Sequence, residues 1–123
     1  MIGTRTTSPS FKINNNDETK NEGLAGQAWF RNATASVGDL PECPNPWSDA
    51  DARCQAYAKA GLLTAKKAGR LKVRSRSLLA TPVRNFKGNQ WGVLVLDSRL
   101  PNTFGPERQA AVTSFATVLS KML

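Results

Sequence analysis

The chain has 123 residues, a hydrophobic fraction of 40% and a formal net charge of +8, which suits one folded domain that buries about two-thirds of its unfolded surface. It contains no histidine, so nucleophilic catalysis that needs an imidazole base is excluded. The longest apolar run, residues 93–96, is too short to cross a bilayer, and the polar first twenty residues lack the apolar core of a signal peptide. A cytoplasmic protein without membrane attachment is expected.

The two cysteines, Cys43 and Cys54, are the remaining candidates for metal or redox chemistry. Without histidine they do not make up a usual zinc site, so no metal and no cofactor is expected. They can form a disulfide if their Cα atoms come within about 7 Å of each other. In a cytosolic protein, two thiols without a special role are the commoner case. The sequence leaves their pairing open.

The N-terminal segment, residues 1–22, is polar throughout and is predicted to be flexible. A weak alternation of apolar side chains gives it at most one short strand around residues 10–13. Residues 23–123 are expected to form the folded domain.

Helical and extended patterns alternate along this domain. Gly61 is a natural helix stop, and the Gly88-Asn89 pair between two apolar runs predicts a hairpin. Pro82 cannot donate a ladder hydrogen bond, so we expect it at an edge or a bulge. Residues 91–96 are nearly all apolar, which predicts a strand covered on both faces. The expected helices are residues 23–32, 48–61, 64–68 and 106–122, and the expected strands are 34–40, 71–74, 77–83 and 90–98.

The closing helix has the clearest pattern. Pro106 suits its first position, and Glu107 lies in the first turn, where the helix dipole favours an acid. Apolar residues then recur at helical spacing and form a wide stripe on one face. Together, the elements predict an α+β domain with an antiparallel sheet and helices on its faces.

The order of these motifs resembles the GAF family. The family pattern opens its second helix with Gly-x-x-Gly, as residues 23–26 do, and it often has Asp-x-Pro where residues 39–41 stand. Its last two strands match residues 77–83 and 92–98, and Phe104 with Glu107 introduces the closing helix as usual. The resemblance implies a GAF-like (PAS/GAF-type) fold and a regulatory sensor module of signal transduction that has no catalytic residues.

The resemblance also implies a fold that is incomplete at the N-terminus, because the family's first helix and first strand have no counterpart here. The strand at residues 91–97 is then expected to have an open edge, and the stripe on the closing helix to attract a partner. We therefore predict a homodimer, or a larger oligomer. The predicted interface residues are Val112, Phe115, Leu119 and Met122.

Small molecules generally bind GAF domains over one face of the sheet, which implies a pocket near residues 39–57 and 71–79. Arginine forks there suit a small anionic ligand, and aromatic walls suit pockets in general. The alternative is that these aromatic residues only pack and the arginines are solvated. The candidate ligand-binding residues are Trp47, Tyr57, Arg74, Ser75, Arg76 and Ser77.

Two other functions are alternatives to the sensor. GAF members that reduce methionine sulfoxide need redox cysteines in the turn of the second helix, where Ala25 stands here, and in a stretch matching residues 70–77, which has none. The sequence therefore predicts that the chain is not an enzyme. A basic run over residues 66–76 offers the alternative of a nucleic-acid-associated protein without sequence specificity, since no aromatic residues for base stacking lie within the run.

Overall fold

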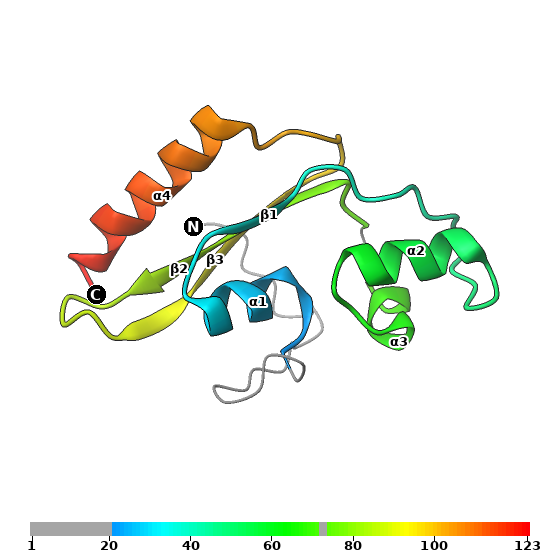
Figure 1. Cartoon of the computed structure of the whole chain (residues 1–123), viewed down its shortest axis with the longest axis horizontal. Helices are drawn as coiled ribbons and strands as arrows, with labels where there is room; N and C mark the ends of the chain where they lie inside the picture. Colours follow the sequence, from blue (N-terminus) through cyan, green and yellow to red (C-terminus); the bar gives the residue numbers. More distant parts are fainter. Residues whose placement is uncertain (1–20, 72–73) are drawn as a thin grey trace.

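The structure, a computed structural model, describes residues 21–71 and 74–123. Its centre is a three-stranded antiparallel sheet in the order β1-β2-β3 (Figure 1). The strands are β1 (Ala35–Val37), β2 (Ser77–Arg84) and β3 (Gln90–Ser98). The helices are α1 (Gly23–Arg31), α2 (Ala52–Ala60), α3 (Ala65–Gly69) and α4 (Pro106–Ser120). The predicted α+β class with an antiparallel sheet is confirmed.

The middle strand, β2, pairs with a short neighbour on one side and a long one on the other. β1 reaches only from Ala80 to Leu78 of β2, whereas β3 pairs along the whole strand with an irregularity at its far end. Pro82 lies beyond the β1 pairing and next to this irregularity, so its missing N–H interrupts no ladder with β1. The β2–β3 connection is a tight turn that uses Gly88 at a φ of 82°.

The two faces of the sheet carry different helices. Leu24 and Ala28 of α1 pack with Ala80 of β2 on one face. The neighbouring residue along β2, Thr81, points to the opposite face and lines a pocket together with Ala116 of α4, because side chains alternate along a strand. In Figure 1, α4 accordingly lies on one side of the sheet and α1, α2 and α3 on the other.

The helices α2 and α3 form a small cluster at one end of the sheet. Its buried core consists of Leu40, Tyr57, Ala58 and Ala68. α2 begins after Asp51, whose side chain accepts a hydrogen bond from the backbone N–H of residue 53 at 2.8 Å, which is the usual role of an N-cap. The packed cluster holds the long loop between β1 and α2 against the sheet.

Some local predictions differ from the structure. The strand β3 is not covered on both faces by the described residues, since Trp91 is 58% exposed and Val95 is 40% exposed. Val95 pairs with Ala80 and therefore lies on the face that carries α1, where α1 leaves part of the edge strand β3 uncovered. Leu71 and Arg74, the described ends of the expected strand 71–74, are not in a strand. The possible strand at residues 10–13 lies outside the described residues.

None of the helices in residues 21–71 and 74–123 is long and apolar enough to cross a membrane.

Candidate functional site

The two cysteines meet at the start of α2. Cys43 comes from the loop after β1, and Cys54 from the first turn of the helix. The Cys43 thiol donates to the Sγ of Cys54 at an S–S distance of 3.5 Å, and both thiols are free. A disulfide is about 2.0 Å long, so the sulfurs must come closer before they bond. Because Cys54 is fully buried and Cys43 only partly so, Cys43 is the thiol that a dissolved molecule can reach.

The surroundings of Cys43 favour its protonated form. Burial and the hydrogen bond with Cys54 raise the pKa of the Cys43 thiol from 9.0 to about 11, although the positive charge of Arg74 acts to lower it. The neutral thiol therefore predominates at neutral pH, and the reactive thiolate is a small fraction.

Arg74 lies next to the thiols with part of its hydrogen-bonding capacity unused. Its guanidinium carbon lies 5.0 Å from the centroid of the Trp47 ring, and its Nη2 donates to the carbonyl of Gly69 at 3.3 Å. Its Nε is buried and has no acceptor among the described residues. A buried donor without an acceptor is destabilising, and an anionic oxygen is the partner that a guanidinium binds best.

Tyr57 connects the thiol pair to the segment before β2. It follows Cys54 by three residues on α2 and donates from its hydroxyl to the backbone carbonyl of Ser75 at 2.9 Å. Burial raises the pKa of this phenol to about 12. The hydroxyl of Ser75 in turn donates to Asp97 of β3 at 2.7 Å. Tyr57 therefore ties the helix that carries Cys54 to residues 70–77, the stretch in which the family resemblance implies a redox cysteine.

The last two candidate ligand residues have partners within the fold. Arg76 donates from Nε to the carbonyl of Leu40 at 2.6 Å and forms ion pairs of 3.2 Å with Asp39 and Glu42. Ser77 is fully buried, and its hydroxyl donates to a backbone carbonyl in the segment after β3. The structure thus brings Trp47, Tyr57, Arg74 and Ser75 together around the thiols, while Arg76 and Ser77 hold neighbouring loops.

The predicted interface residues lie along α4. Phe115 is 48% exposed and Met122 is 77% exposed, whereas Val112 and Leu119 are half-buried. The exposed members form a flank of the helix rather than the face that packs on the sheet.

Sequence reasoning did not single out the thiol pair as a site. The cysteines are 11 positions apart, and the three prolines between residues 41 and 46 shape the loop that brings Cys43 back to the helix. The signal available in the sequence was a proline-rich loop between a strand and a helix, with one cysteine in the loop and one in the helix.

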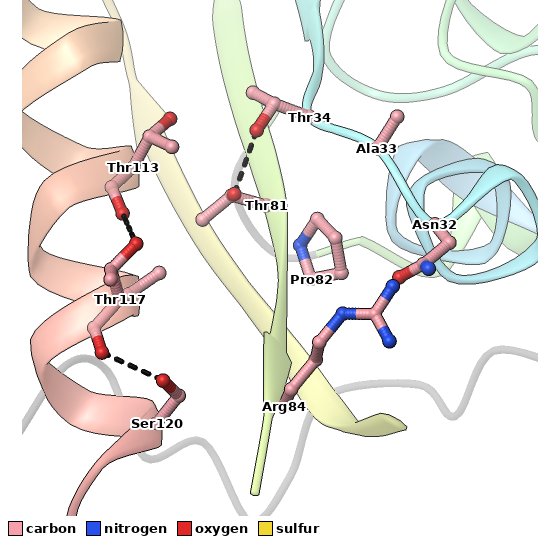
Figure 2. Close-up of a pocket in the computed structure, with 10 residues that line it drawn as sticks. Asn32, Ala33, Thr34, Thr81, Pro82, Arg84, Thr113, Thr117 and Ser120 are labelled. Carbon is pink, nitrogen blue, oxygen red and sulfur yellow. Dashed lines mark hydrogen bonds between the residues drawn. The ribbon is translucent and has the colours of Figure 1, made fainter. Parts of the chain in front are cut away.

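A separate pocket of about 260 Å³ lies between α4, β2 and the α1–β1 connection (Figure 2). Half of its ten lining residues carry a hydroxyl, and no residue of α2 or of its preceding loop takes part. Thr34 and Thr81 bond to each other at 2.7 Å, and Thr113 and Thr117 donate to carbonyls one helical turn earlier. This pocket is therefore distinct from the thiol site, and the fold itself uses much of its hydrogen-bonding capacity.

The basic run does not form one free cationic face. Lys67 lies 3.8 Å from Glu22, Arg74 stacks on Trp47, and Arg76 is paired with acids. Residue 72 lies outside the described residues.

No protein-family model matches the chain, and no curated protein matches its sequence. Among solved structures, the chain is similar to free methionine-R-sulfoxide reductase from Neisseria meningitidis in complex with its substrate, with a TM-score of 0.53 and 26% identity over 80% of this chain and 46% of that one. It is also similar to type II free methionine-R-sulfoxide reductase from Thermoplasma acidophilum, with a TM-score of 0.52 and 19% identity over 80% of this chain and 54% of that one. The chain spans about half the length of these structures.

These neighbours confirm the GAF-like fold and correct the expected function. They are enzymes, so the predicted non-catalytic sensor of signal transduction, and the prediction that the chain is not an enzyme, are wrong. The nucleic-acid alternative finds no support among them. The two places where the resemblance implies redox cysteines have none here, whereas Cys43 and Cys54 lie elsewhere in the chain, and one fold carries several functions. The similarity points to a family of sulfoxide reductases with a GAF-like fold rather than to GAF sensors.

Proposed function

We propose that this chain reduces free methionine (R)-sulfoxide, with Cys43 and Cys54 as its two reacting thiols. The observation that carries the proposal is the 3.5 Å contact between their sulfurs in a fold similar to that of free methionine-R-sulfoxide reductases. Two adjacent thiols supply the two electrons that reduction of a sulfoxide requires.

The difference in exposure assigns the two roles. Cys43, the accessible thiol, attacks the sulfoxide sulfur, which releases methionine and leaves the oxygen on Cys43 as a sulfenic acid. Cys54, the buried thiol, then attacks the Cys43 sulfur, so that a disulfide forms and the oxygen leaves as water. An external dithiol reduces this disulfide and restores both thiols. Over the cycle, one sulfoxide and one external dithiol become one thioether, one disulfide and one water.

Two side chains beside the thiols suit the carboxylate and the side chain of an amino acid. The guanidinium of Arg74 has a buried N–H without an acceptor among the described residues, and it is the group that we assign to the substrate carboxylate. Trp47 lies against this guanidinium and offers an apolar wall to the substrate side chain. The substrate carboxylate would then supply the anionic group expected from the sequence.

A single-turnover assay tests the proposal. The fully reduced protein is incubated with L-methionine (R)-sulfoxide or (S)-sulfoxide without added reductant, and the methionine formed is quantified by chromatography. The wild type should form one equivalent of methionine from the (R) form only, and mass spectrometry should find Cys43 linked to Cys54. Cys43→Ser should form none, and Cys54→Ser should form one equivalent and retain a sulfenic acid that a dimedone probe captures.

Added dithiothreitol should make the wild type catalytic. Circular dichroism of each variant separates loss of chemistry from loss of folding. The proposal is wrong if neither diastereomer yields methionine while the protein is folded, or if the Cys43→Ser variant retains activity. Reduction of the (S) form instead would contradict the assignment of the substrate.

A further inference from the structure

The strand β3 presents a long edge that no described residue pairs with. It is nine residues long and lies at the end of the sheet order β1-β2-β3. Asp97 is its only charged residue, and it contains no proline. Proteins usually protect such an edge with charges, proline or a covering element, because its free N–H and C=O groups otherwise pair with another strand.

An apolar flank of α4 lies on the same side of the molecule as this edge. The opposite flank faces β1, because Gln109 bonds to Ser36 at 3.5 Å and the hydroxyls of α4 line a pocket with Thr34. At 100° per residue, Phe115, Val118 and Met122 project from the side of the helix away from these hydroxyls. Since β3 lies across β2 from β1, the apolar flank faces the β3 side.

The two apolar surfaces lie on the same face of the sheet. Leu94 and Leu96 of β3 pair with Thr81 and Leu79 of β2. Directly opposed residues share a face of the sheet, and Thr81 points to the face that carries α4. Leu94 and Leu96 are half-buried, while Phe115, Val118 and Met122 are 48%, 56% and 77% exposed. These five residues form what we call the β3–α4 surface.

The charge distribution favours a second copy of this chain as the occupant of this surface. The whole chain has a net charge of +8, yet residues 90–98 and 106–121 together carry two acids and two bases. The excess positive charge therefore lies elsewhere, so that two β3–α4 surfaces can meet without net repulsion between them.

We propose that two copies of this chain pair antiparallel through the outer edges of their β3 strands, with a twofold axis at Leu94, to form a six-stranded sheet. Leu94 is the central residue of Gln90–Ser98, and only this register overlaps both strands over their full length. Val93 then lies opposite Val95 of the partner subunit. The two Asp97 carboxylates end up about 20 Å apart at roughly 3.4 Å per residue, so no like charges face each other.

Strand pairing alone does not complete this interface. A stable interface takes about 20 to 30 residues from each partner, more than β3 supplies. The two α4 helices lie above the β2 strands, three strand spacings or about 14 Å apart, which is wider than the ~8–10 Å between packed helices. The long side chains of Phe115 and Met122 from both copies fill this gap above Leu94. The proposal is independent of the sulfoxide reductase activity.

Light scattering coupled to size-exclusion chromatography tests the oligomeric state of the full chain. We expect twice the mass of the 13.3-kDa chain. Higher salt should preserve the dimer or strengthen it, because salt screens the repulsion between two positively charged bodies. A monomer at every protein and salt concentration would overturn the proposal. Protection of the β3 edge from hydrogen exchange in such a monomer would mean that a segment of its own chain covers the edge.

Cysteine crosslinking tests the register, in a background with Cys43→Ser and Cys54→Ser. Leu94→Cys places two thiols on the axis, where directly opposed Cβ atoms are about 4.5–5.5 Å apart, and mild oxidation should give a covalent dimer. Leu96→Cys is the matched control, since the two residues 96 are offset by about 13 Å along the strands and should not crosslink. Equal crosslinking of both variants, or none, would refute the β3 register even if the protein is dimeric.

A charge substitution tests the pairing of the β3 edges without introduced cysteines. Val95 is 40% exposed, so the folded monomer tolerates Val95→Lys, but the dimer would bring two lysines within about 7–8 Å of each other across the axis. We expect the dissociation constant of the dimer to rise at least tenfold. Leu100→Lys is the control, because Leu100 is 70% exposed and lies outside β3. Equal association of the wild type and Val95→Lys would contradict the proposal.

Discussion

The two ends of this molecule differ in how far their apolar side chains are buried. Around α2 and α3, apolar groups such as Leu40 are fully buried, and polar groups such as the Tyr57 hydroxyl have partners within the fold. At β3 and α4, large apolar side chains such as Trp91 and Met122 are exposed. The first region completes its own packing and holds the thiols, whereas the second leaves an apolar surface. Substitutions in the first should therefore change stability or chemistry, and those in the second should change association.

The largest expected effect is on the packing of the α2–α3 cluster. Leu40→Ala removes a fully buried side chain that contacts this core, and large-to-small core substitutions typically destabilise by about 2–5 kcal/mol. Urea unfolding of the two variants Leu40→Ala and Leu100→Ala makes the comparison. Because Leu100 is 70% exposed, its substitution should change the free energy of unfolding by less than about 0.5 kcal/mol. Equal losses would mean that the cluster is not a packed core.

A smaller loss is expected from the hydrogen bond that joins α2 to the segment before β2. Tyr57→Phe removes the hydroxyl that donates to Ser75 and leaves the buried ring in place. A buried acceptor left without its donor destabilises by about 1–3 kcal/mol. Urea unfolding of Tyr57→Phe and the wild type measures this loss of stability. An unchanged midpoint would mean that water replaces the hydroxyl as the donor and that this contact does not hold the site together.

The elements of this fold could largely be predicted from local sequence patterns. The apolar stripe and Pro106 define α4, and the Asn85–Asn89 turn between two apolar runs defines the β2–β3 hairpin. Burial was less predictable, because an apolar strand has the same pattern whether or not a neighbour covers it. The exposure of Trp91 depends on where the helices pack on the sheet, which is a tertiary property.

The site was harder to predict than the fold. Aromatic and arginine side chains near the thiols were identified by type, and the structure gathers Trp47, Tyr57 and Arg74 there. The closeness of Cys43 to Cys54 depends on the path of the proline-rich loop, which local propensities do not specify. Arg76 looked equivalent to Arg74 in sequence, yet its donors are used by Leu40, Asp39 and Glu42, and only the three-dimensional path of the loops decides this.

A subtler effect is expected where α3 touches Trp47. A Cβ added at Gly69 would lie 3.0 Å from Trp47 Cδ1, so Gly69→Ala should displace the indole and weaken its stacking on Arg74, an interaction worth about 0.5–2 kcal/mol. The gain in helix propensity of up to about 1 kcal/mol opposes this loss. The net change in stability should be small, and the Trp47 indole N–H resonance should move. Gly92→Ala, with no atom within 4 Å of the added Cβ, should leave that resonance unchanged.

The most direct measure of the thiol site is the dependence of the protein's stability on pH. The folded protein raises the pKa of Cys43 from 9.0 to about 11, so the folded state holds this proton more tightly than the unfolded state does. The resulting stabilisation is fully present below pH 9 and is lost as the pH rises towards 11. Tyr57, with its pKa raised to about 12, acts in the same direction at higher pH, so the comparison must be between the wild type and Cys43→Ser.

Alkylation of Cys43, followed by peptide mapping, reports the same pKa independently, because only the thiolate reacts. Its rate should rise about tenfold per pH unit and level off near pH 11. A plateau near pH 9 would mean that neither burial nor Cys54 perturbs this thiol, and the two sulfurs would then not form the close pair on which the proposed chemistry depends.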